Sequence, residues 1–323
     1  MTDNQAIIAE ANRLSLGRAS GIKLDNGIIS LVLDVSGLDA KTRGDMEDAI
    51  KSHLSTMNDV HEVRIVMTAE KKNVTIIAVA SGKGGVGKST VSTNLAIALK
   101  KRGVKVGIVD ADIYGPSQPR LLGSEGTKPE ARDSKMIPVP NDYGVPMLSM
   151  GQLVKDGQAI AWRGPMAGNA LGQLIDAEWT SSGIDTLIVD MPPGTGDVQL
   201  SMVQKHKPKG AVIVSTPQDL ALIDATRAIS LFEQAGVPII GIIENMAGYI
   251  CPHCGEVSEP FGHGGAEGAA QNMEAQFLGR IPLSLEIREA SDAGKPPAAG
   301  TDPSSEPFDA IAARVAAWLE KNR

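Results

Sequence analysis

The sequence of 323 residues is poor in aromatic side chains and has no excess of positive charge. Phe, Trp and Tyr make up 3% of it, and 31 Lys and Arg residues stand against 38 Asp and Glu, for a net charge of −7. Proteins that bind nucleic acid usually present basic surfaces, and those that bind single strands stack bases on aromatic rings. We therefore expect no nucleic-acid partner.

Long apolar runs are also absent. No apolar stretch approaches the ~20 residues that cross a bilayer, and Met1–Gln5 do not form a basic segment ahead of an apolar core. We expect no membrane partner, no secretory signal and a cytoplasmic location. The segment Phe308–Lys321 predicts a helix with one apolar face. Its polar face has few Lys and Arg, which favours packing on the core over membrane attachment.

Cysteine is scarce, since the chain contains only Cys251 and Cys254. A bond between them would close too short a loop to stabilise the fold much. In a reducing compartment, these thiols would stay free for metal binding or redox chemistry.

One glycine-rich segment carries a strong chemical signature. Residues Ser81–Thr90 fit the pattern G-x-x-x-x-G-K-[ST], whose backbone N–H groups cradle nucleotide phosphates. The apolar run Val74–Ala80 predicts a buried strand before the loop, and Lys88–Arg102 predicts a helix after it, which is the context that this loop requires. The residues expected to bind the nucleotide here are Gly82, Lys83, Gly84, Gly85, Val86, Gly87, Lys88, Ser89 and Thr90.

Aspartates end two further apolar segments. Asp110 follows Ile108–Val109 and is itself followed by Asp112, while Asp190 follows Leu187–Val189. Ligands bind at the carboxyl ends of parallel strands. We expect Asp190 and Ser89 to hold Mg²⁺, and Asp110 or Asp112 to position the attacking water. A single aspartate at the end of a strand would more simply be a strand-end or helix-cap residue. Two strands that end in aspartate, both after the phosphate loop in the sequence, favour a catalytic role instead.

Lys83 and Lys88 complete the predicted catalytic set with Asp110, Asp112 and Asp190, and Gly194 is a further residue expected to bind the nucleotide. Lys88 would reach the β- and γ-phosphates. Lys83 is a second lysine inside the loop, which the basic pattern does not require. Gly194 lies in the segment Asp190–Asp197, where its backbone N–H would contact the γ-phosphate and move on hydrolysis, as switch segments do.

The order of predicted elements indicates two domains. Residues 1–70 predict a small α+β unit with helices over Asn4–Leu16 and Ala40–Ser55, a hairpin turning at Asn26-Gly27, and a third strand over Val60–Met67. Residues 69–73 form a polar linker. Residues 71–323 alternate strand and helix, which predicts an α/β domain with a doubly wound, mostly parallel sheet.

The expected elements of the second domain can be given by their ranges. Strands are expected over Val74–Ala80, Val104–Asp110, Val145–Ser149, Thr186–Asp190, Ala211–Ser215, Ile239–Ile243 and Leu278–Ile281. Helices are expected over Lys88–Arg102, Pro165–Ala177, Asp197–Gln204, Gln218–Ala235 and Phe308–Lys321, and a loop over Pro129–Asp142.

Lys83, Asp112 and the segment Asp190–Asp197 together resemble the deviant Walker A ATPases. These include nitrogenase iron protein, the MinD/ParA partitioning ATPases and the Mrp/ApbC iron–sulfur carriers. The resemblance implies a homodimer that encloses ATP, in which Lys83 reaches the phosphates of the other subunit. It also implies adenine as the base.

Two residues near the end of the chain are candidates for contact with that base. Asn245 follows Ile242–Ile243, and its amide would pair with the adenine edge, although a turn role at the end of a strand explains it equally well. The segment Gly279–Pro282 would wall the base, with Pro282 at its end.

The cysteine pair allows three interpretations. A C-x-x-C redox centre prefers a helix start, whereas Gly255–Pro260 here is poor helix material. A structural zinc site needs four ligands, and His253 and His263 do not complete a standard spacing. A cluster shared across a two-fold axis needs only two thiolates from each subunit.

The sequence from Cys251 to Cys254, placed after the Asn245 strand, resembles the Mrp/ApbC branch. The resemblance implies that Cys251 and Cys254 bind a transferable iron–sulfur cluster at the dimer interface, with 4Fe-4S as the expected type. The small domain before such ATPases often carries a Thr-x-x-Cys-Pro element after its hairpin. In this sequence the segment Val35–Ala40 stands in that place, and it contains no cysteine. We therefore expect no metal in that domain, and a docking role remains open.

The sequence thus predicts an ATP-hydrolysing, Mg²⁺-dependent carrier that receives clusters from assembly scaffolds and passes them to apoproteins. The main alternative is a MinD/ParA-like positioning ATPase, which a basic surface or membrane tail would favour. A third interpretation is a nucleotide-dependent regulator stabilised by zinc.

Overall fold

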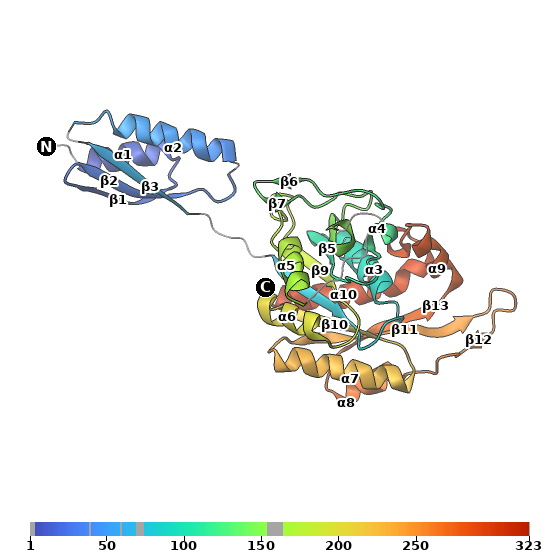
Figure 1. Ribbon diagram of the computed structural model, residues 1–323. Helices are drawn as coiled ribbons and strands as arrows, with labels where there is room; N and C mark the ends of the chain where they lie inside the picture. Colours follow the sequence, from blue (N-terminus) through green and yellow to red (C-terminus); the bar gives the residue numbers. More distant parts are fainter. Residues whose placement is uncertain (1–3, 39, 59, 69–73, 154–163, 323) are drawn as a thin grey trace. The chain divides into compact units, whose positions relative to one another are not determined.

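The computed structural model describes residues 4–38, 40–58, 60–68, 74–153 and 164–322. Its contacts divide the chain into two compact units, Met1–Asn73 and Val74–Arg323 (Figure 1). The polar linker expected at 69–73 lies outside the described residues.

The first unit packs two helices on a three-stranded sheet. Its elements are α1 (Asn4–Leu14), β1 (Ala19–Asp25), β2 (Ile28–Asp34), α2 (Ala40–Leu54) and β3 (Glu62–Thr68). Strand β2 lies in the centre, antiparallel to β1 and parallel to β3. The predicted hairpin is confirmed, because Asn26 and Gly27 both have the positive φ that a tight two-residue turn needs. Buried Ile7, Leu31 and Ile50 join helices and sheet.

The second unit is built on one sheet with strand order β12-β11-β10-β4-β9-β5-β8, and β13 pairs with β11. The strands are β4 (Thr75–Ala80), β5 (Val106–Asp110), β8 (Met147–Ser149), β9 (Thr186–Asp190), β10 (Gly210–Ser215), β11 (Ile239–Ile250), β12 (Val257–Ser258) and β13 (Phe277–Leu283). All of these pairings are parallel except that of β11 with β12. The expected α/β fold with a mostly parallel sheet is confirmed.

Helices cover both faces of this sheet (Figure 1). Successive strand residues point to opposite faces and are apolar here, so both faces have to be buried. Ile77 and Val79 of β4 face a core with α3 (Lys88–Lys101), α9 (Leu285–Asp292) and α10 (Glu306–Lys321). Ile76 and Ala78 face the other core. Its helices are α5 (Gly164–Ile175), α6 (Asp197–His206), α7 (Asp219–Gln234) and α8 (Gly265–Asn272). Phe308 and Leu319 of α10 are buried, so the core-packing interpretation of this helix is confirmed.

Some sequence-based boundaries were wrong. The strand expected to end at Ile243 continues to Ile250, because β13 pairs along it as far as Tyr249 and β12 then pairs with its end. The expected loop at Pro129–Asp142 contains a small hairpin of β6 (Ala131–Arg132) and β7 (Lys135–Met136). The short helix α4 (Gln118–Leu121) and helices α8 and α9 were not foreseen.

The strand order brings the candidate site residues together at the carboxyl ends of the central strands. Strand β9 lies between β4, which leads into the phosphate loop, and β5, which ends at Asp110. In the register of the sheet, Asp190 lies beside Val79 on one side and beside Asp110 on the other. Residues more than 100 positions apart in the numbering therefore meet.

Candidate functional site

The glycine-rich loop has a backbone that only glycine adopts easily. Gly85 and Gly87 have φ values of 80° and 79°, in the left-handed region that side chains disfavour. A Cβ on Gly82 would lie 2.0 Å from the carbonyl oxygen of Asp224 in α7, and one on Gly87 would lie 2.2 Å from the Asn245 amide nitrogen. Gly82 and Gly87 are therefore needed for packing against α7 and β11.

Lys88 forms a buried ion pair at the start of α3. Its Nζ lies 2.5 Å from Asp190 Oδ1, and the two side chains are 6% and 0% exposed. The hydroxyl of Ser92 donates to the same oxygen at 3.0 Å. The lysine expected to reach phosphates and the carboxylate expected to serve Mg²⁺ are thus each other's partner in the structure.

Asp110 is fully buried at the end of β5. Its Oδ2 accepts from the backbone N–H groups of Ser117 and Gln118 and from the Ser149 hydroxyl, at 2.9–3.0 Å, and its Oδ1 accepts from the backbone of Asp112. Burial, with a smaller contribution from the charge of neighbouring Asp190, raises the pKa of Asp110 to about 7. Asp110 thus anchors the start of α4.

Asp112 is half-buried and lies in the loop between β5 and α4. Its Oδ1 accepts from the backbone N–H groups of Tyr114 and Gly115 at 3.1 Å. Of the two aspartates considered for positioning water, Asp112 has the greater access to solvent. Its catalytic role stays a prediction.

Lys83 and Gly194 each form one hydrogen bond that links the phosphate loop to another part of the second unit. The half-buried Lys83 donates from Nζ to Oε1 of Gln218 at 3.2 Å, just before α7. The N–H of Gly194 donates to the Ser81 carbonyl at 3.1 Å. Gly194 is therefore tied to the phosphate loop in this structure, and its contact with a γ-phosphate stays a prediction.

Asn245 lies within β11 and is 7% exposed. Its Nδ2 donates to the Val86 carbonyl of the phosphate loop at 2.7 Å, a contact that neither the adenine nor the turn interpretation foresaw. Pro282 is half-buried in β13, next to Ile281, which pairs with Asn245. Contact of either residue with a base stays a prediction.

The cysteines lie in the connection between β11 and β12, outside the core. Cys251 is half-buried and Cys254 is exposed. Two backbone hydrogen bonds of 2.9 Å shape the turn, from Cys251 N–H to the Glu256 carbonyl and from Gly255 N–H to the Cys251 carbonyl. The backbone N–H groups of Cys254 and then His253 lower the pKa of the Cys251 thiol, which favours the thiolate that binds metals.

This cysteine hairpin, residues 250–257, provides two ligands but not a closed metal site. Among the described residues, no three or more His, Cys, Asp or Glu side chains are grouped so as to hold a metal ion. His263, considered above as a zinc ligand, instead has its Nδ1 2.9 Å from Glu259 Oε1. Four-coordinate metal binding would need ligands from elsewhere.

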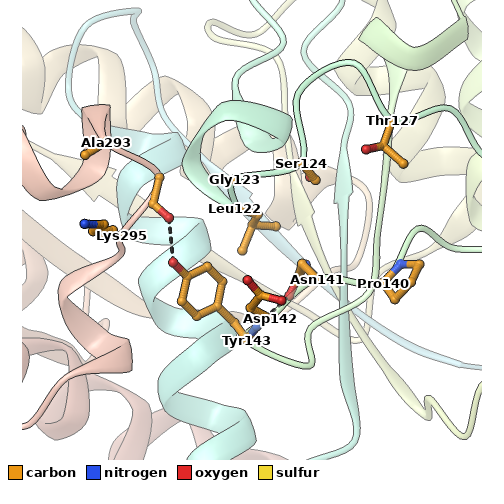
Figure 2. Close-up of a pocket in the computed structure, with 11 residues that line it drawn as sticks. Leu122, Gly123, Ser124, Thr127, Pro140, Asn141, Asp142, Tyr143, Ala293 and Lys295 are labelled. Carbon is orange, nitrogen blue, oxygen red and sulfur yellow. Dashed lines mark hydrogen bonds between the residues drawn. The ribbon is translucent and has the colours of Figure 1, made fainter.

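A pocket beyond α4 is separate from both sites. Tyr143 donates from its hydroxyl to the Gly294 carbonyl at 2.5 Å, and Asp142 and Lys295 are among the other residues that line the pocket (Figure 2). None of the predicted site residues lines this pocket.

Sequence reasoning missed two buried polar residues, of which Gln118 contacts the phosphate site and Glu244 joins β11 to α8 and β13. Gln118 contacts Asp190 and Ser89. Glu244 is fully buried in β11 and accepts from the α8 backbone at Ala266 and from Arg280, both at 2.9 Å. The sequence signals that could have drawn attention to them are the position of Gln118 between two prolines and the position of Glu244 in an apolar strand.

Similarity to curated proteins extends over about three quarters of the chain. The chain is 48% identical over 246 residues to the "Iron-sulfur cluster carrier protein" of Pseudomonas fragi, an alignment covering 76% of this chain and 84% of that protein. It is 50% identical over 248 residues to the protein of the same name from Escherichia coli K12, covering 76% of this chain and 66% of that protein.

Solved structures share the fold. A nucleotide-binding protein from Archaeoglobus fulgidus in complex with ADP superposes with a TM-score of 0.63 and 38% identity, over 73% of this chain and 92% of that one. The cell division ATPase MinD of Pyrococcus furiosus gives 0.54 with 23% identity, over 76% and 99%. The second likeness concerns the fold alone.

No helix in the described part of the chain has the length and apolar character needed to cross a membrane.

A family model described as "ParA: NUBPL iron-transfer P-loop NTPase" matches residues 72–316. This match and the identity to the carrier proteins agree with the phosphate loop, the aspartates at the strand ends and the cysteine hairpin, and the chain belongs to the NUBPL-type iron-transfer branch of the ParA P-loop NTPases.

Proposed function

We propose that two copies of this chain bind ATP and Mg²⁺ and together hold an iron–sulfur cluster, which they pass to recipient apoproteins. The observation that carries the proposal is the cysteine hairpin. It offers two accessible thiols, one with a lowered pKa, and no third ligand among the described residues. A cluster that needs four thiolates is completed when a second copy supplies the other pair. The names of the relatives support iron–sulfur clusters as the cargo.

The residues of the phosphate site fit Mg²⁺–ATP. The loop glycines leave room for phosphate oxygens, Lys88 supplies a cation, and Ser89 and Asp190 supply oxygen ligands of the kind that Mg²⁺ prefers. Bound Mg²⁺ would neutralise charge on the phosphates. Lys88 would exchange the Asp190 carboxylate for the β- and γ-phosphates, and Lys83 would exchange Gln218 for the phosphates of the other copy.

Strand β11 gives the two sites a direct connection. Asn245 contacts the phosphate loop at Val86, and the same strand continues to Ile250, immediately before Cys251. Movement of the loop on nucleotide binding or hydrolysis would shift the base of the cysteine hairpin. ATP can bias the hold on a cluster only if it binds two arrangements of the protein with different affinity, and β11 is the element through which we expect that bias to act.

Anaerobic reconstitution with iron and sulfide tests the cargo. We expect the wild-type chain to gain a cluster of about four iron and four sulfide per dimer, with its optical absorption. Cys251→Ser and Cys254→Ser should each lose the cluster while keeping ATP binding. His253→Ala, between the two cysteines, is the matched control and should keep the cluster.

Metal analysis of protein purified without oxygen separates cargo types. Iron and sulfide contents that are unchanged in Cys251→Ser would refute the cluster assignment. Zinc at one equivalent per chain, in place of iron, would support the zinc-stabilised regulator instead.

A further inference from the structure

A buried glutamine connects all three parts of the phosphate site. Gln118, the first residue of α4, is 0% exposed. Its side-chain Nε2 donates to Asp190 Oδ2 at 2.9 Å and to the Ser89 carbonyl at 3.0 Å. Its backbone N–H donates to Asp110 Oδ2 at 3.0 Å. The glutamine thus joins the ends of β5 and β9 to the first turn of α3.

The orientation of the Gln118 amide is fixed by its neighbours. The hydroxyl of Thr93, also buried, lies 2.6 Å from Gln118 Oε1 and donates to it. Turning the amide over would place its oxygen against the Asp190 carboxylate and the Ser89 carbonyl, so that acceptors would face acceptors. Because every polar atom of the side chain has a partner, the amide is held with its donor toward Asp190.

We propose that Gln118 is a positioning residue for Mg²⁺–ATP, which holds the Asp190 carboxylate and the Ser89 turn in place when Lys88 moves to the phosphates. In the described arrangement, Asp190 Oδ1 accepts hydrogen bonds from Lys88 and Ser92, while Oδ2 accepts one from Gln118. Departure of Lys88 leaves Ser92 and Gln118 as the two neutral donors that keep the carboxylate oriented. The inference rests on the proposed binding of ATP and Mg²⁺ at this site.

The chemistry of an amide suits this position better than that of other side chains of similar size. A lysine would compete with Mg²⁺ for Asp190, and a glutamate would add a third carboxylate beside Asp110 and Asp190. A methionine fills the same volume but donates no hydrogen bond. Groups that orient a metal ligand from behind typically affect metal affinity by about 10–100-fold.

The test compares ATP affinity with Mg²⁺ and with EDTA. For Gln118→Met we expect the gain in affinity that Mg²⁺ provides to fall about tenfold, while the affinity in EDTA stays near that of the wild type. Thr93→Val keeps the glutamine but removes the donor that fixes it, so we expect a smaller fall in the same ratio. A fluorescent ATP analogue gives both affinities without any need for turnover.

Asn94→Leu is the matched control. Asn94 is a buried amide on the same helix α3, but it bonds to the backbone at Thr90 and Ala298, away from the carboxylates. We expect it to lower the thermal midpoint and to leave the Mg²⁺-dependent ratio unchanged.

The inference fails alone if the wild type shows a large Mg²⁺-dependent ratio and both Gln118→Met and Thr93→Val keep it, or if Gln118→Met lowers the two affinities equally. A wild-type chain that binds ATP no better with Mg²⁺ than in EDTA would refute the proposed nucleotide site, and the inference with it.

Discussion

The phosphate site and the cysteine hairpin are built on opposite principles. At the phosphate site, Lys88, Asp110, Asp190 and Gln118 are buried, and hydrogen bonds within one copy engage them all. In the hairpin, backbone hydrogen bonds shape the turn, and Cys254 is exposed. A single copy thus holds Lys88, Asp110 and Asp190 in place by its own contacts, whereas the proposed function needs a second copy for half of the cluster ligands and for Lys83.

The largest effect is expected at the one loop cation assigned to the other subunit. Lys83→Ala should lower ATP hydrolysis by about a thousandfold, since a cation supplied in trans to the phosphates has an effect of that size. The half-buried Lys83 side chain donates to the neutral amide oxygen of Gln218, so the free energy of unfolding should change little. Steady-state hydrolysis and urea unfolding measure the two quantities. Full activity in this variant would show that each copy works alone.

Lys88→Ala should have the largest effect on stability. It leaves the fully buried Asp190 without its cation, and breaking a buried ion pair typically costs about 3–5 kcal/mol. Urea unfolding of the nucleotide-free protein measures this, with Lys83→Ala as the matched control. A loss below 1 kcal/mol would show that this ion pair contributes no more to stability than an exposed one.

Asp110→Asn should flatten the dependence of stability on pH. Because the folded chain raises the pKa of Asp110 from 3.8 to about 7, its contribution to stability is fully present below pH 3.8 and is lost as the pH rises toward 7. The linkage amounts to roughly 4 kcal/mol at most. Urea unfolding from pH 5 to 7.5 should show the wild type losing stability relative to the variant. Parallel profiles would contradict the burial of a titrating group here.

The smallest expected effect concerns the connection between the two sites. Asn245→Leu removes the bond to Val86, and we expect it to reduce the influence of ATP on cluster transfer by about tenfold, the equivalent of one buried hydrogen bond. Transfer to an apo-ferredoxin with and without ATP measures this. The unchanged transfer rate without ATP is the internal control. An undiminished ATP effect would mean that β11 does not carry the coupling.

Sequence alone predicted the parts of the site that follow from local patterns. The loop glycines, Lys88 and the strand ends at Asp110 and Asp190 were each marked by an apolar run next to polar residues. The sheet order then brought them together, as parallel α/β folds require.

Contacts made across the fold were beyond sequence analysis. Nothing near Gln118 in the chain indicates that it will face Asp190, 72 positions away. The bond of Asn245 to Val86 spans 159 positions, and the extension of β11 depends on pairing with β12 and β13. Such contacts are decided by tertiary packing, which overrides local preference.

The ion pair of Lys88 with Asp190 also bears on how a nucleotide would come and go. Without nucleotide, the Lys88 ammonium lies 2.5 Å from Asp190 Oδ1, so that it would return to this carboxylate when ADP departs and no unpaired cation would remain inside the protein. Entry and exit of the nucleotide then become an exchange of one counter-ion for another. The contribution of Lys88 to nucleotide affinity would then be the difference between its two ion pairs, which would ease release of the nucleotide.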